Sequence, residues 1–116
     1  MRKPTKEESI QILRELPKEQ AFYFHRDVEM PTGISANSLA RFIDSIKIVD
    51  VVSLEFHMSR GDFEKWVLML GDETLSLQIA NLKLGTLHGV TMRKRLLQIL
   101  RLRLGYLRKL ANVQRA

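Results

Sequence analysis

The residues from Thr91 to about Asn112 carry a long helical pattern, and the rest of the chain has to fold around it. Apolar and polar positions recur there at the spacing of an amphipathic helix. The apolar side is formed by Met92, Leu96, Ile99, Leu100, Leu107 and Leu110, and it is widened by Leu97, Leu102 and Leu104. Because this side covers much more than about 100° of arc, we expect a helix that packs on two sides or forms a dimer interface.

Charge is distributed unevenly along the chain. All thirteen acidic residues lie at or before Glu73, together with ten of the nineteen lysines and arginines, so this part has a net charge of −3. From Thr74 to Ala116 there are nine basic residues and no acid, which gives +9. Such a separation favours an anionic partner, an acidic face of the same fold, or a twofold-related copy.

The polar side of the C-terminal helix forms a regular row of cations. Lys94, Arg101 and Arg108 recur every seven residues, and Lys109 lies beside them. Solvated helix faces usually mix charges, because oppositely charged pairs at i and i+4 stabilise a helix. The four residues are therefore predicted to bind nucleic acid or another polyanion. A solvated face without a ligand is one alternative, and docking on a protein partner or a second copy in a homodimer is another.

Arg103 interrupts the apolar side of the same helix. A buried and unpaired guanidinium is very costly, so the side chain needs a carboxylate or access to water. We expect Arg103 to pair with an acid from the first 73 residues, or with a residue across a dimer.

The N-terminal half predicts a helix, a strand and a second helix. Thr5 and Glu8 match a capping box, and Pro17 ends the helix that follows. The short aromatic segment Ala21–His25 is predicted to be a strand. After a loop, Ser35 is the expected N-cap of a helix to about Ile48.

A second strand is predicted from Val51 to Met58, where apolar and polar residues alternate. A helix between the two strands favours a right-handed parallel βαβ unit, and a third strand near Lys83–Leu87 is a weaker candidate. The expected fold class is α+β: one mostly helical domain over residues 1–116, with a small two- or three-stranded parallel sheet covered by helices and a long C-terminal helix at 91–112.

Two further helices are expected in the middle of the chain. Ser59 and Asp62 match another capping box, for a helix that Gly71 ends. Asp72 is the expected N-cap of a shorter helix that runs to about Leu82.

Pairing of the two predicted strands would place His25, Glu55 and His57 on one face, and two histidines with one carboxylate can bind zinc or iron. Hydrogen-bonded structural histidines are the favoured interpretation of His25 and His57. No phosphate loop, dinucleotide fingerprint or nucleophile elbow is present. We therefore expect a binding or regulatory module without a cofactor, not an enzyme.

The composition indicates a cytoplasmic protein that does not enter a membrane. The chain has no cysteine, and its first residues contain no apolar segment typical of a signal peptide. No apolar run approaches the roughly 18 residues that a membrane-spanning helix needs.

Several short segments between Ala21 and Leu82 occur in a distinctive order. They are AFYFH at 21–25, TGISANSL at 32–39 with Phe42, VD at 49–50, SLEFH at 53–57, RGDFEKWV at 60–67 and LGD at 70–72. These segments resemble an uncharacterised family of prokaryotic, largely archaeal, domains of unknown function. The resemblance implies one small α+β unit and draws attention to His57, Asp62 and Trp66. It implies no substrate and no cofactor.

Overall fold

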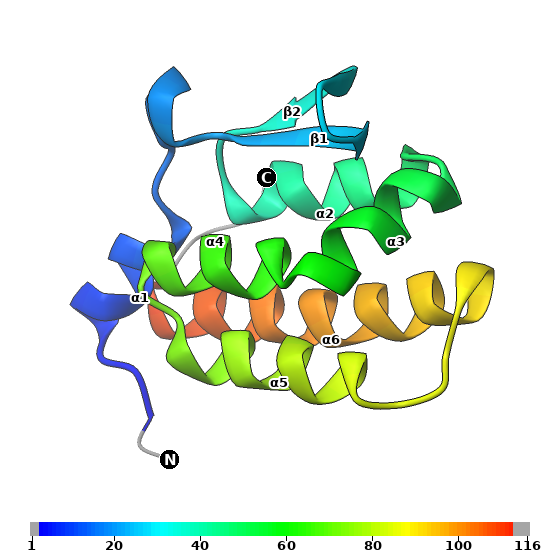
Figure 1. Cartoon of the computed structure of the whole chain (residues 1–116). Coiled ribbons are helices and arrows are strands. Elements are labelled where there is room, and N and C mark those ends of the chain that lie inside the picture. The colour runs from blue at the N-terminus through cyan, green and yellow to red at the C-terminus, as the bar shows by residue number, and fades with distance from the viewer. Residues whose placement is uncertain (1–2, 113–116) are drawn as a thin grey trace.

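The computed structural model describes residues 3–112, which form one β-hairpin, six α-helices and a short 3₁₀ helix. In chain order these are α1 (Lys6–Leu13), η1 (Lys18–Gln20), β1 (Phe22–Asp27), β2 (Met30–Ala36), α2 (Leu39–Ile48), α3 (Val51–Arg60), α4 (Asp62–Leu70), α5 (Glu73–Lys83) and α6 (Gly89–Leu110). The hairpin lies over α2 and α3, and α6 runs below them beside α5 (Figure 1). None of the described helices is both long enough and apolar enough to cross a bilayer.

The sheet is an antiparallel hairpin, so the predicted parallel sheet is wrong. Phe22 pairs with Ala36 at one end of the hairpin, and Asp27 pairs with Met30 at the turn. The β2 segment contains Pro31 and Gly33, and these two residues are the reason why the sequence predicts a loop there. Proline is tolerated here because both strands of a two-stranded sheet are edge strands.

The predicted second strand, Val51–Met58, is helix α3. Asp50 caps this helix, since its Oδ1 accepts a hydrogen bond from the backbone N–H of Ser53 at 2.9 Å. Leu54 and Met58 then lie one turn apart on the buried side. The third strand expected near Lys83–Leu87 is also wrong, because α5 extends to Lys83 and a loop follows.

Two of the predicted helix caps are confirmed. The Thr5 hydroxyl accepts from Glu8 N at 3.0 Å, and the Glu8 carboxylate accepts from Thr5 N at 2.9 Å. Asp72 caps α5 by accepting from the N–H of Leu75.

The other two caps are wrong. Ser35 belongs to β2, and α2 is capped by Ser38. Ser59 lies inside α3, which Gly61 ends in the left-handed conformation with φ +76°. A residue with a side chain rarely adopts that conformation, so Gly61 makes the tight corner between α3 and α4.

The core has an aromatic half and an aliphatic half. Rings from the hairpin and from α2 and α4 pack together under the sheet, and they are Phe22, Phe24, Phe42, Phe63 and Trp66. Leu96, Leu100 and Leu107 of α6 are fully buried in the aliphatic half. Because α6 contacts α1, α2, α3 and α5, the expected packing of this helix on more than one side is confirmed.

Candidate functional site

The outward side of α6 carries the four predicted cations, Lys94, Arg101, Arg108 and Lys109, which we call the basic ridge. Lys94, Arg101 and Lys109 are exposed, and Arg108 is half-buried. A separation of seven residues places Lys94 and Arg101 about 10 Å apart along the helix axis. The ridge therefore presents cations at regular intervals along one edge of the fold.

None of the four ridge side chains makes a hydrogen bond or ion pair with another residue between 3 and 112. Internal electrostatics of the described chain therefore do not account for their presence. The four cations have no carboxylate partner among residues 3–112 and repel one another, and an anionic ligand would relieve that repulsion.

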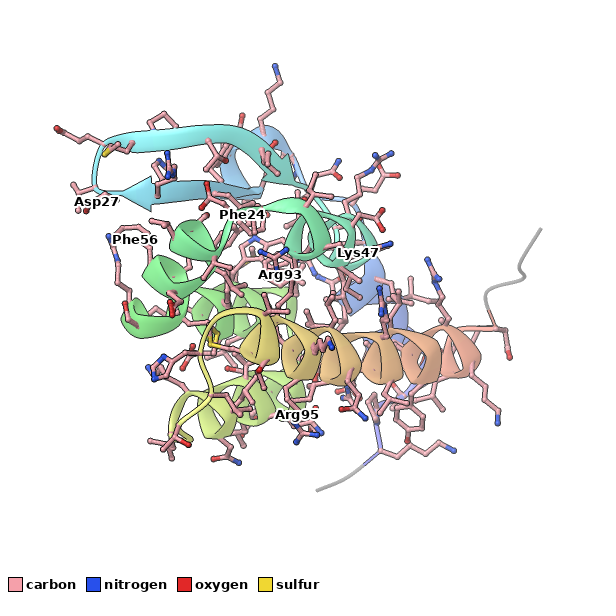
Figure 2. The ribbon with its side chains drawn as sticks, turned by 90° about the vertical axis from the view of Figure 1, so that its right-hand side faces the viewer. Phe24, Asp27, Lys47, Phe56, Arg93 and Arg95 are labelled. Carbon is pink, nitrogen blue, oxygen red and sulfur yellow. The ribbon has the colours of Figure 1, made fainter. Side chains whose placement is uncertain are left out.

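Other cations of the acid-free segment are used inside the fold. Lys83 pairs with Glu64 at 3.4 Å. Arg93 donates to the carbonyl oxygens of Lys47 and Val49, at the C-terminal end of α2, where the helix dipole favours a positive charge. In Figure 2, Arg93 lies on the side of α6 that faces Lys47, and Arg95 lies on the opposite side.

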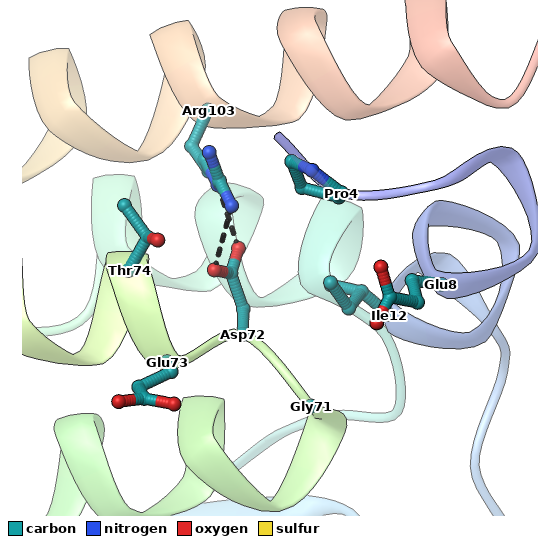
Figure 3. Close-up of a pocket in the computed structure, with 8 residues that line it drawn as sticks. All are labelled: Pro4, Glu8, Ile12, Gly71, Asp72, Glu73, Thr74 and Arg103. Carbon is teal, nitrogen blue, oxygen red and sulfur yellow. Dashed lines mark hydrogen bonds and ion pairs between the residues drawn. The ribbon is translucent and has the colours of Figure 1, made fainter. Parts of the chain in front are cut away.

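Arg103 forms the ion pair that the sequence predicts. Its Nε and Nη2 atoms donate to the two carboxylate oxygens of Asp72 at 2.8 and 2.9 Å (Figure 3). The side chain of Asp72 is 1% exposed and that of Arg103 is 10% exposed. The guanidinium also lies 5.5 Å from the ring centre of Tyr106. This pair fixes α6 to the start of α5 and leaves Arg103 unavailable to a ligand.

A groove of about 380 Å³ lies between α5, the loop that follows it and α6. Its lining consists of Gln78, Asn81, Leu82, Gly85, Leu87, Arg95 and Ile99. The lining contains no acidic residue, and Arg95 is its only charged residue. Arg95 Nη1 donates to Gln98 Oε1 at 3.1 Å, which connects the groove to the ridge side of α6.

The buried histidine, His57, has a structural role, as the favoured interpretation predicts. Its Nε2 accepts a hydrogen bond from the backbone N–H of His25 at 2.8 Å, and its Nδ1 lies 2.8 Å from Asp62 Oδ2. The ring is therefore neutral, with the proton on Nδ1 donated to Asp62. Burial lowers the pKa of His57 from 6.5, against the opposing effect of Asp62.

The metal site considered for His25, Glu55 and His57 is not formed. Within residues 3–112, no group of three histidine, cysteine, aspartate or glutamate side chains is placed to hold a metal ion. Residues 55 and 57 would share a face on a strand, but on helix α3 they point about 200° apart. Glu55 instead lies 3.7 Å from His88, and both ring nitrogens of His57 are occupied.

The comparison with known families assigns this chain to a group without an established activity. A model of a family of unknown function, DUF5752, matches residues 4–101. The chain belongs to the DUF5752 family. The match confirms the resemblance found over Ala21–Leu82 and extends it in both directions. It includes Lys94 and Arg101 of the ridge, whereas Arg108 and Lys109 lie beyond it. No similar protein was found among curated proteins or solved structures.

The groove residues Gln78, Asn81 and Arg95 were not predicted from the sequence. The i and i+3 spacing of the two amides shows only that they share one side of α5. Their position opposite Arg95 depends on the antiparallel packing of α5 on α6, which no local pattern specifies.

Proposed function

We propose that this DUF5752 member is a nucleic-acid-binding module that contacts phosphates through the basic ridge of α6. The observation that supports the proposal is the outward position of Lys94, Arg101 and Lys109, without partners among the described residues and in a segment without acids. The neighbouring cations Arg93 and Arg103 already serve the fold, so they are not part of the proposed contact surface.

The chemistry of the ridge favours binding that does not depend on base sequence. Lysine and arginine contacts to phosphate position a nucleic acid but do not distinguish bases. Each neutralised phosphate releases condensed counterions, so affinity falls as salt rises. Four contacts would give a slope of about −3.6 in a plot of log K against log salt for duplex DNA, and about −2.8 for a single strand.

A salt titration of binding, followed by fluorescence anisotropy, tests the proposal. Labelled duplex DNA, single-stranded DNA and RNA are compared for the unmodified chain and for the double variant Lys94→Glu/Arg101→Glu. We expect the variant to lose binding to every probe. The matched control is Lys18→Glu/Lys65→Glu, which changes net charge equally at exposed positions outside α6 and should keep the affinity.

Two results would reject nucleic-acid binding through the ridge. One is the absence of binding to all three probes at low salt. The other is equal loss of affinity in the ridge variant and in the control, because net charge alone would then explain the interaction.

A protein-docking role is the second candidate, and exposed apolar residues on α6 favour it. Leu102 is 71% exposed and Tyr106 is 39% exposed. A second copy or a partner protein could cover them. Light scattering tests the homodimer: a dimer that Leu102→Asp converts to a monomer would support it, and a monomer at every concentration would reject it.

A further inference from the structure

The groove between α5 and α6 has the composition of a binding site for a flat, polar-edged group. Its apolar lining is supplied by the half-buried side chains of Leu82, Leu87 and Ile99. Gln78 and Asn81 contribute exposed amides, and neither amide has a hydrogen-bond partner among the described residues. An apolar floor with a few convergent polar groups is typical of sites for small ligands.

The polar groups of the groove match the edge of a nucleobase. Each carboxamide offers two donors and an acceptor, and asparagine and glutamine side chains pair with base edges in this way. The planar guanidinium of Arg95 can stack on an unstacked base. The absence of acids from the lining removes the repulsion that a phosphate next to the base would otherwise meet.

The volume of the groove favours a single base over a duplex. That volume is about 380 Å³, which lies in the range of pockets for small ligands and is too small for a section of duplex. A duplex therefore has to stay outside, on the ridge. A single base extruded from an unpaired strand needs much less room. Its phosphates would remain near the ridge because Arg95 donates to Gln98, which lies on the same side of α6 as Lys94 and Arg101.

We infer that the α5–α6 groove accepts a base of a single-stranded nucleic acid whose backbone follows the basic ridge. The inference rests on the proposed function, and it specifies the ligand as a single strand with at least one unstacked base. Gln78 and Asn81 recognise the base edge, and Arg95 contacts its face.

The experiment compares four anionic probes at one salt concentration. The probes are homopolymeric DNA and RNA single strands of equal length, the corresponding DNA duplex, and heparin, which is a polyanion without bases. The groove variant is Gln78→Ala/Asn81→Ala. Its matched control is Gln11→Ala, which removes an exposed amide from α1. Circular dichroism verifies that each variant is folded.

We expect the unmodified chain to bind at least one single strand more tightly than the duplex. The groove variant should lose about tenfold in affinity for that strand, the effect of one good amide–base contact. Its affinity for duplex and heparin should not change, and Gln11→Ala should behave like the unmodified chain.

The outcomes separate this inference from the proposed function. Ridge-dependent binding with no effect of the groove variant would overturn the inference and leave phosphate binding intact. Absence of binding to every probe would reject both. A preference for the duplex would also overturn the inference, and so would equal affinity for heparin and for the single strands.

Discussion

At the scale of single residues, His57 joins three elements through one imidazole ring. The ring belongs to α3, accepts a hydrogen bond from His25 in β1 and donates one to Asp62 at the start of α4. Protonation of Nε2 would abolish the bond from His25, because that nitrogen could no longer accept. The hairpin is thus attached to the helices by a bond that only the neutral histidine can make.

We predict that acidification weakens the fold through His57. Burial lowers its folded-state pKa from 6.5, so the unfolded chain binds the proton more tightly. The stabilisation is complete above about pH 6.5 and decreases as pH falls from there toward the lower folded-state pKa. Urea unfolding between about pH 8 and pH 5 measures this decrease in the free energy of unfolding.

The variant His57→Gln should be less stable at neutral pH and less sensitive to pH. His88→Gln is the control, because His88 is exposed and should leave the pH profile unchanged. The charged neighbours of His57 are His25, Asp62 and Arg60. If His57→Gln keeps the full pH dependence, the prediction is wrong.

Asp72 and Arg103 provide a second residue-scale prediction. Arg103→Met would leave the Asp72 carboxylate buried without its cation, and breaking such a pair costs about 3–5 kcal/mol in the free energy of unfolding. The double variant Arg103→Met/Asp72→Asn should recover most of that loss, because asparagine keeps the N-cap of α5 without a charge. Denaturant unfolding of both single variants and the double variant gives the coupling between the two sites. Equal stability of Arg103→Met and the unmodified chain would contradict the prediction.

Residue chemistry also shows how far the sequence predicts the site. The position of Arg103 on the apolar side of its helix predicts an ion pair with a carboxylate, and Asp72 provides that carboxylate. The hydrogen-bond partner of His57 in β1 cannot be predicted from the sequence in this way, because His25 and His57 are brought together only by packing of the hairpin on α3. The roles of Gln78 and Asn81 likewise cannot be predicted from the sequence, because the groove exists only once α5 and α6 are packed.

At the scale of elements, the segment Val51–Met58 shows why local periodicity misleads. Eight residues of alternating polarity fit a strand, and they also fit a helix in which Leu54 and Met58 are buried one turn apart. The deciding signal is Asp50, which precedes the segment and satisfies a free N–H of the first turn. The long C-terminal pattern was predictable because six turns of consistent amphipathicity leave no comparable alternative.

We predict that Asp50→Ala lowers the free energy of unfolding by about 1 kcal/mol, the usual value of a helix N-cap. Asp50→Ser should have little effect, because a serine hydroxyl also caps. The ion pair between Asp50 and Arg26 is lost in both variants, and it contributes little because both side chains are about half exposed. Equal destabilisation by alanine and serine would show that the ion pair, and not the cap, stabilises this region.

At the scale of the whole molecule, the acid-free segment from Thr74 onward contains two kinds of cation. Lys83, Arg93 and Arg103 bind groups of the acidic body or of a helix end, which explains part of the charge separation visible in the sequence. The ridge residues make no such contact within residues 3–112. Stability and ligand binding should therefore depend on different cations of the same helix.

Neighbouring positions on α6 allow this division to be tested directly. Arg93→Met removes two hydrogen bonds from a charged donor to the end of α2, so we expect a loss of about 2 kcal/mol in the free energy of unfolding. Lys94→Met and Arg101→Met change exposed side chains and should stay within about 0.5 kcal/mol of the unmodified chain. In nucleic-acid binding the order should reverse, with the two ridge variants weakened and Arg93→Met unchanged under conditions where it is folded. Urea unfolding and anisotropy on the same three proteins measure both effects. If the ridge variants were destabilised as strongly as Arg93→Met, the ridge would serve the fold, and its cations would give no reason to expect a ligand.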